Sequence, residues 1–532
     1  MIFSVTCKSW LCINTIRCIK LTKNKNENIT IVKNTVISYL RIICTTVCSL
    51  LTVRYLIGSL GVERYGVYAL ITGVIIILTF LNSAMTVSTQ RYLSFYQGTG
   101  NKEQLGVVFK TSCILHLIVG TLLAVILLLL MSTILEDFIN IDNALVDETR
   151  YLYLGVVTSI IVSIITVPLN ALVISRENFR VDALILIFKS LMMLLTSLYM
   201  NAIGEHARLA FLGIAIAAIS TLTFFAYFLY CKVCYIECTF KTPLVRGVFI
   251  EMSAFALWSL YSNICYVLNT QGINVIINKF FDAKMNAAYG IAFQINGQVK
   301  NLSQTLLSAM NPQIMKSEGK DNRYRTVNVS IVASKVGFFL VALITTPLLY
   351  ILPDVIELWL GVIPDYVVMF SFFFLFSNLV NQLTVGVTPA IQAIGNIKKF
   401  QLWIGSTALL VLPISYLMLY FNAPIYYVMC LLLLIEFVTG YLKVYIFSEF
   451  FDIGMKWYLN KVILKMALPF VITNSVALIF SSYVVFYGSE LLIAVISVML
   501  YLSSSYIFSL ETNEKIVLNK IMRSLIMKFK GW

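Results

Sequence analysis

The amino-acid sequence predicts an all-α polytopic membrane protein with about fourteen transmembrane helices. The 532 residues are 59% hydrophobic and only 12% charged, and the mean hydropathy is +0.88. Apolar stretches of about 20 residues or more recur along the chain, and each is long enough for a helix to cross roughly 30 Å of hydrocarbon. The short alternating segments of a transmembrane β-barrel are absent. The spans are therefore predicted to be helices.

Two sets of six spans and a final pair account for these stretches. The first six lie at about 35–57, 65–88, 107–131, 151–174, 182–203 and 208–230. The next six lie at about 251–279, 286–311, 327–351, 366–393, 400–420 and 424–446, and the pair at 460–484 and 487–508. Asn82-Ser-Ala-Met85 near the end of span 2 matches the Ser-Ala-Met at 308–310 near the end of span 8, which indicates an internal repeat. Because each half has six spans, this repeat is parallel, with a pseudo-two-fold axis along the membrane normal.

The chain is expected to divide into five parts. They are a basic cytoplasmic arm (1–33), an N-lobe (34–235), a C-lobe (236–450), a C-terminal helix pair (451–510) and a basic amphipathic tail (511–532). The predicted external loops hold only five basic residues: Arg64, Arg150, Arg208, Lys279 and Lys284. The positive-inside rule therefore places both termini in the cytoplasm.

Several classes of function are excluded by what the sequence lacks. Cys231, Cys234 and Cys238 cluster, but no second pair or histidine lies near them, so no metal site is predicted. No phosphate-binding Gly-x-x-x-x-Gly-Lys loop occurs, and we expect neither enzymatic activity nor a cofactor. The net charge of +14 follows mainly from the topology, and no soluble basic domain is present to hold a nucleic acid.

Ionisable residues inside the spans are the candidates for function, because such a group costs roughly 3 kcal/mol or more in a bilayer. Lys300 lies near the middle of the apolar stretch 286–311. The other deep cations are Arg41, His116, Lys189 and Lys335, and Glu436 is the only deep carboxylate identified. These cations predict an anionic ligand, although Arg41, Lys189 and Lys335 have snorkelling as an equal alternative. Snorkelling is expected for the cations nearer the helix ends: Arg54, Lys110, Lys443 and Lys465.

Neutral polar residues on spans 7 and 8 are predicted to line a wet cavity around Lys300. They are Asn263, Asn274, Gln294, Asn296, Gln298, Asn301 and Gln304. Asn296, Lys300 and Gln304 share one face of a helix. Hydrogen bonds between neighbouring helices explain the neutral residues equally well. Glu436 either neutralises a cation or carries a coupling proton or sodium ion.

Several motifs resemble those of Wzx-type polysaccharide flippases, which belong to the multidrug/oligosaccharidyl-lipid/polysaccharide (MOP) exporter superfamily. They are Leu60-Gly-Val-Glu-Arg-Tyr-Gly-Val-Tyr68, Asn82-Ser-Ala, Thr89-Gln-Arg-Tyr-Leu-Ser94 and Pro168-Leu-Asn-Ala-Leu-Val-Ile-Ser-Arg-Glu-Asn178. The resemblance covers the chain from about residue 33 to the last spans. It implies a MATE-like fold, with two six-helix lobes around a V-shaped cavity that opens alternately to each side of a bacterial inner membrane.

The resemblance also implies a cargo and partners. The cargo would be an oligosaccharide on an undecaprenyl diphosphate carrier, for O-antigen, capsule or another surface polysaccharide, whose diphosphate or acidic sugars meet cationic cavity residues. A polysaccharide polymerase and glycosyltransferases are the expected partners. Fourteen spans resemble the lipid II flippases as well, whereas many Wzx-type members have twelve. A multidrug antiporter and a non-transporting scaffold of a glycan-assembly complex remain as alternatives.

Overall fold

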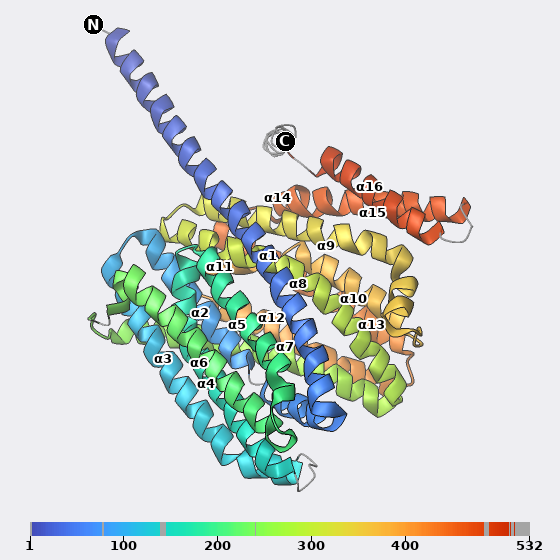
Figure 1. Cartoon of the computed structure of the whole chain (residues 1–532). Helices are drawn as coiled ribbons and strands as arrows, with labels where there is room; N and C mark the ends of the chain where they lie inside the picture. The colour runs from blue at the N-terminus through green and yellow to red at the C-terminus, as the bar shows by residue number, and fades with distance from the viewer. Residues whose placement is uncertain are drawn as a thin grey trace, which may run out of the picture. The chain divides into compact units, whose positions relative to one another are not determined.

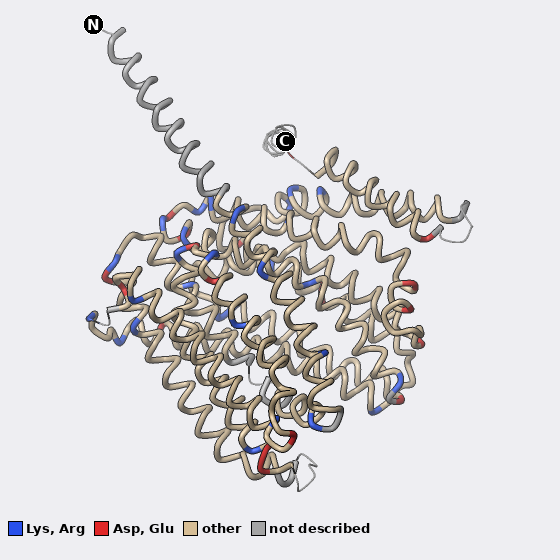
Figure 2. Tube along the Cα trace, viewed as in Figure 1, with Lys and Arg blue, Asp and Glu red and all other residues tan. Residues whose placement is uncertain are grey.

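The computed structural model describes residues 3–76, 79–138, 145–239, 241–483, 489–509, 511 and 515. Side chains are described from residue 30 onward within these ranges, except those of 62, 63, 73–76, 79–81, 136–138, 239, 283, 482, 483 and 489. Every element in these residues is a helix (Figure 1). Most of the predicted tail, 511–532, and the side chains of most of the predicted arm, 1–33, lie outside the described residues. Figure 2 shows that the long helices consist mainly of uncharged residues, with charges gathered towards their ends.

The helices follow one another with short connections. The first half contains α1 (Phe3–Ile76), α2 (Thr79–Thr99), α3 (Lys102–Leu129), η1 (Thr133–Phe138), α4 (Val146–Ser175), α5 (Phe179–Tyr199), η3 (Met200–Ala202), η4 (Glu205–Ala207), α6 (Arg208–Cys234) and η5 (Ile236–Thr239). The second half contains α7 (Arg246–Phe280), α8 (Ala283–Gly319), α9 (Arg323–Leu360), α10 (Val367–Gln382), α11 (Val387–Ile394), α12 (Lys398–Tyr420), α13 (Ile425–Phe451), α14 (Met455–Tyr458), η6 (Leu459–Ile463), α15 (Leu464–Tyr483) and α16 (Ser489–Phe508).

Eleven of the described helices are long and apolar enough to cross a membrane, and the number is twelve if α10 and α11, which meet at a bend of 46°, form one span. The two predicted spans that fall short of this test are span 2, in α1 and α2, and span 8, in α8. The reason in α8 is its polar content, which includes Asn296 and Lys300. Its 37 residues still extend roughly 55 Å at 1.5 Å per residue, which is ample to cross a bilayer.

Two compact units divide the chain. Unit 1 comprises Met1–Leu257 and Ser308–Lys320, and unit 2 comprises Trp258–Leu307 and Asp321–Trp532. The boundary at Leu257 lies within α7, whereas the predicted lobes meet at residue 235. The start of α7 belongs to unit 1 because it packs on α2, where Ser88 donates a 3.2 Å hydrogen bond to the carbonyl of Met252.

Unit 1 has its apolar core between α1, α3, α4 and α6, with Leu152 and Tyr153 fully buried at its centre. Within α1 the helix breaks at Gly61, whose φ of 76° and ψ of 168° suit glycine. The helices α4 and α6 approach closely where Gly155 meets Gly213, since a Cβ on Gly155 would lie 2.1 Å from the Gly213 carbonyl oxygen. Small residues at this crossing allow the two backbones to touch.

Two apolar clusters lie in the described part of unit 2. One joins α7, α8, α9, α10, α12 and α13 around Tyr289 and Phe370. The other joins α8, α9, α10, η6, α15 and α16 around Phe338 and Tyr501, so the last two helices pack on α9 (Figure 1). The predicted helix pair therefore forms part of unit 2.

Candidate functional site

A cavity of about 310 Å³ lies within unit 2, between α7, α8, α10, α12 and α13. Each helix contributes residues three or four positions apart, so that one face of each helix forms part of the wall. On α8 these residues are Tyr289, Phe293, Asn296 and Lys300. On α13 they are Met429, Leu432, Ile435, Glu436, Thr439 and Lys443.

One end of the cavity is apolar and the other is polar. Along α8, α10 and α13 the lining residues change from apolar to polar in the direction of the chain. Because one spanning helix separates each of these three helices from the next, all three run in the same direction. At the apolar end Tyr289 and Phe293 contact Phe374 with ring centroids 5.1 and 5.7 Å apart. At the polar end the wall carries the charged residues.

Lys300 reaches the cavity beside an aromatic ring. Its Nζ lies 5.2 Å from the ring centroid of Tyr266 and 3.5 Å from the Tyr266 hydroxyl oxygen. A cation over a ring gains about 0.5–2 kcal/mol, depending on how far it is desolvated. The lysine is half-buried and forms no ion pair within the described part of the chain. The ring positions the ammonium group without neutralising it.

Lys443 and Glu436 complete the charged end. Lys443 is 7% exposed, and no described residue forms a hydrogen bond or ion pair with it. The carboxylate Oε1 of Glu436 accepts a 2.6 Å hydrogen bond from Asn381 Nδ2. Lys443 interacts electrostatically with both Glu436, which attracts it, and Lys300, which repels it. The described wall thus carries two positive charges and one negative charge, which favours an anion.

The sequence predicted some of this wall and missed the rest. Lys300, Asn296 and Glu436 are predicted site residues that line the cavity. Snorkelling was expected for Lys443, whereas this lysine is 7% exposed and lines the cavity. Asn378 and Asn381 were also missed. The three- and four-residue spacing of Glu436, Thr439 and Lys443 was a signal that could have revealed the α13 face.

Arg41 lies in unit 1 and is paired with Asp182. Asp182 is 1% exposed and also accepts hydrogen bonds from Asn170 Nδ2 at 2.6 Å and from the Tyr227 hydroxyl at 2.8 Å. It is a buried carboxylate that the sequence did not reveal. The predicted span 5 began at residue 182, which put Asp182 at the surface, whereas α5 begins at Phe179.

The remaining predicted cations lie apart from the cavity wall. His116 is buried on α3, where its Nδ1 lies 2.8 Å from the carbonyl oxygen of Ser112. Lys189 is half-buried on α5 and forms no hydrogen bond or ion pair with any described residue. Lys335 is buried on α9, with Nζ 3.8 Å from the carboxylate of Glu511. A role of any of them in binding cargo stays a prediction.

The predicted polar residues other than Asn296 do not line this cavity. Gln294, Gln298, Asn301 and Gln304 lie on other faces of α8. Asn274 donates a 3.3 Å hydrogen bond to the carbonyl of Thr270 in its own helix, and Asn263 is half-buried on α7. Helical spacing shows which residues share a face, but it cannot show which of several polar faces encloses a cavity.

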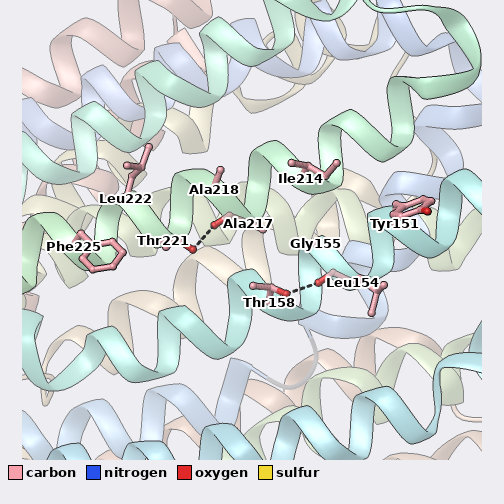
Figure 3. A pocket seen from close by; sticks show the side chains of 10 residues that line it. All are labelled: Tyr151, Leu154, Gly155, Thr158, Ile214, Ala217, Ala218, Thr221, Leu222 and Phe225. Carbon is pink, nitrogen blue, oxygen red and sulfur yellow. Dashed lines mark hydrogen bonds between the residues drawn. The ribbon is translucent and has the colours of Figure 1, made fainter.

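A second hollow, of about 610 Å³, lies along α4 and α6 in unit 1 (Figure 3). Its lining is almost entirely apolar and includes Leu154, Ile214 and Phe225. The hydroxyls of Thr158 and Thr221 donate to Leu154 and Ala217 of their own helices, both at 2.8 Å. No ionisable side chain except the phenol of Tyr151 lines it in the described structure. This hollow has almost no groups that could bind a charged cargo, so the cavity of unit 2 is the better candidate for the functional site.

Comparison with known proteins identifies the fold. Residues 39–200, all in unit 1, match the model of the MatE family. No match is found among curated proteins. The structure is similar to the outward-facing conformation of a multidrug resistance MATE family transporter of the MOP superfamily, with a TM-score of 0.69 and 14% identity over 80% of this chain and 95% of that chain.

A MOP superfamily transporter from Pyrococcus furiosus is similar to the same degree, with a TM-score of 0.67 and 14% identity over 80% of this chain and 96% of that chain. It is described as having a binding pocket of reverse polarity that suggests a different function. These likenesses confirm the predicted fold class, an all-α polytopic MATE-like fold. At so low a sequence identity they show the fold alone.

Proposed function

We propose that this chain is a transporter that moves an oligosaccharide, linked to an undecaprenyl diphosphate carrier, from the inner to the outer leaflet of a bacterial cytoplasmic membrane. The observation that carries the proposal is the cavity of unit 2, where Lys300 and Lys443 face the same space as one carboxylate. The MATE-like fold supports transport by alternating access. Since one fold hosts different cargoes, the charge of the site must decide the cargo class.

The polar end of the cavity suits the carrier diphosphate and the first sugars. Two ammonium groups can each donate charge-assisted hydrogen bonds to phosphate oxygens, and such bonds are roughly twice as strong as neutral ones. Asn296, Asn378 and the hydroxyl of Thr439 lie in the same wall and can bond sugar hydroxyls. Lys443 is buried and Lys300 half-buried, and the one carboxylate of the described wall does not balance both charges. Because a buried charge is costly until it is neutralised, an anionic cargo gains from binding here.

The size of the cavity limits how much of the cargo it holds. About 310 Å³ is at the lower end of the range for small-molecule sites. It accommodates a diphosphate with part of a sugar, whereas a polyprenyl chain is much larger. The carrier tail therefore stays in the lipid while the head group occupies the cavity.

Transport also needs a cargo that binds two states with different affinity. Lys300 and Lys443 repel one another in the empty cavity. A bound diphosphate removes this repulsion, so it stabilises whichever state brings the two lysines closer. The energy that returns the empty transporter would come from an ion gradient or the membrane potential, for which Glu436 is the candidate carrier.

The alternatives differ in what they require of this cavity. A multidrug antiporter for cationic drugs needs an excess of carboxylates, and the described wall has the opposite balance. A lipid II flippase carries the same diphosphate, so the two flippases share this site and differ in the sugar. A non-transporting scaffold needs no cationic cavity.

Neutralising both lysines tests the proposal. Purified K300Q/K443Q in vesicles is expected to flip lipid-linked oligosaccharide at least about tenfold more slowly, because a hydrogen bond to a charged group contributes about 1.5–3 kcal/mol. The matched control is K398Q/K399Q, which removes two lysines that lie outside the cavity wall. If K300Q/K443Q flips the cargo as fast as the unaltered protein, the cationic cavity is not the site. If the unaltered chain alone in vesicles flips no lipid-linked oligosaccharide, the result favours the non-transporting scaffold over the flippase.

A further inference from the structure

Three lysines of unit 2 converge on one carboxylate. Oε1 of Glu511 lies 3.1 Å from Nζ of Lys465, 3.5 Å from that of Lys461 and 3.8 Å from that of Lys335. The lysines come from three elements, α15, η6 and α9, and Glu511 follows α16. We call these four residues the lysine cluster. Among the described residues, its ion pairs set three positive charges against the negative charge of Glu511.

The lysine cluster is accessible and is built into the fold. The side chains of Lys461, Lys465 and Glu511 are 37%, 35% and 33% exposed, while that of Lys335 is 7% exposed. The hydroxyl of Ser509 donates a 2.9 Å hydrogen bond to the carbonyl of Lys465, which ties the chain after α16 to the start of α15. The site is therefore a partly exposed group of charges that includes one buried lysine.

The cluster also lies towards one end of two candidate membrane spans. Lys461 and Lys465 are the seventh and eleventh residues of the span Met455–Ser481, and Glu511 lies three residues beyond the span Glu490–Phe508. Nζ of Lys461 lies 5.2 Å from the ring centroid of Trp457, which is 37% exposed. Tryptophan is enriched at the membrane–water interface, where its amphipathic ring matches the head-group region.

We propose that Lys335, Lys461 and Lys465 bind the phosphate of an anionic phospholipid from the adjoining leaflet, and that the carboxylate of Glu511 occupies this site when no such lipid is bound. A phosphate offers several acceptor oxygens to three ammonium groups, whereas Glu511 presents the same oxygen to all three. This site is separate from the cargo cavity, and the inference does not depend on the proposed function.

Binding of phosphatidylglycerol to the full chain in detergent, measured by native mass spectrometry, tests the proposal. K461Q/K465Q is expected to weaken binding of the tightest lipid about fivefold for each lysine removed. E511Q is expected to strengthen it about fivefold, because the competing carboxylate loses its charge. Phosphatidylcholine should bind at this site in none of the proteins.

The start of α12 provides a matched control. Lys398 lies 5.3 Å from the ring centroid of Trp258, and Lys399 pairs with Glu449 at 2.6 Å. K398Q/K399Q and E449Q thus remove the same charges from a similar surface and should leave the tightest lipid bound. Equal losses in the two double lysine variants, or no gain in E511Q, would overturn the proposal. Displacement of the lipid by an equal concentration of inorganic phosphate would show a site for free phosphate and overturn the choice of a lipid.

Discussion

The two units treat their charged residues differently. In unit 1 several deep or partly buried charges have fixed partners, as three ion pairs show: Arg41–Asp182, Arg176–Glu237 and Lys316–Glu177. Lys189 is the exception noted above, since no described residue pairs with its side chain. In the cavity of unit 2, Lys300 and Lys443 have no anionic partner within hydrogen-bonding or ion-pair distance among the described residues. A paired charge is already neutralised and favours one arrangement of helices. A charge without a partner is available to a ligand.

Corresponding helices show the same contrast. Asp182 is the fourth residue of α5 and Gln401 the fourth residue of α12, and both are buried, at 1% and 4% exposure. The separation of these two positions in the sequence is close to that of the Ser-Ala-Met segments of the internal repeat. Unit 1 has a carboxylate there with three hydrogen-bonding partners, and unit 2 has a neutral amide. The carboxylate of Asp182 therefore gives unit 1 a structural ion pair with Arg41. The neutral Gln401 pairs with no cation in this way, and the lysines of unit 2 keep their charges for the cavity.

The largest expected effect comes from breaking the pair in unit 1. D182N leaves Arg41 without its counter-charge and should lower the free energy of unfolding by about 3–5 kcal/mol. Denaturation of the purified protein in detergent measures it. R41M/D182L, which removes both charges, should recover most of the loss. If the free energy of unfolding of D182N lies within about 1 kcal/mol of that of the unaltered protein, the pair is no stronger than a surface ion pair. That result would contradict the contrast between the paired charges of unit 1 and the cavity charges of unit 2.

Removing the carboxylate from the cavity of unit 2 should change binding more than stability. E436Q raises the net charge of the wall from one to two positive charges. At an effective dielectric constant of about 20 and a separation of about 10 Å, one charge changes the interaction energy by about 1.7 kcal/mol. We therefore expect E436Q to bind a soluble diphosphate sugar at least about tenfold more tightly by calorimetry. Unchanged or weaker binding would show that Glu436 does not act on the ligand electrostatically.

The turn before α5 allows a smaller test of how tightly unit 1 is fixed. Glu177 has a φ of 61°, and its carboxylate accepts hydrogen bonds from Gln313 and Lys316. The turn before α12 has Gly395 instead, with a φ of 99°. E177A loses the bonds and keeps the strain, while E177G loses the bonds and relieves the strain. The free energy of unfolding of E177A should therefore be about 1 kcal/mol lower than that of E177G. G395A should lower the free energy of unfolding of the unaltered protein by a similar amount. Equal stability of E177A and E177G would exclude strain at this turn.

The sequence predicted the helices, the fold class and the presence of deep cations, because these depend on local composition and length. The segment Pro168–Asn178 was also visible as a motif. Its physical role was not visible, since Asn170 bonds Asp182 and Tyr227, and Glu177 bonds residues of α8 that are distant in the sequence. Which cation finds a carboxylate depends on how distant helices meet, and helical periodicity carries no information on that.

The smallest expected effect lies at the lysine cluster, where unit 2 has paired charges of its own. The hydrogen bond from Lys465, and then the charges of Lys335 and Lys461, lower the pKa of Glu511 below its ordinary value. The stabilisation is therefore fully present above the pKa of glutamate in the unfolded chain, about 4.3, and is lost as the pH falls through the lower pKa of the folded protein. Because Glu511 is partly exposed, we expect less than about 1 kcal/mol.

Comparing the unaltered protein with E511Q isolates this contribution from the other carboxylates that titrate in acid. The difference in their free energies of unfolding should be constant from neutral pH to about pH 5 and should shrink below about pH 4. A difference that persists into strong acid would mean that packing, and not charge, holds Glu511. A difference that vanishes would show that unit 2 uses ion pairs at its edge as unit 1 does in its interior. The lack of an ion-pair partner for Lys300 and Lys443 among the described residues would then be a property of the cavity itself, as a site for an anion requires.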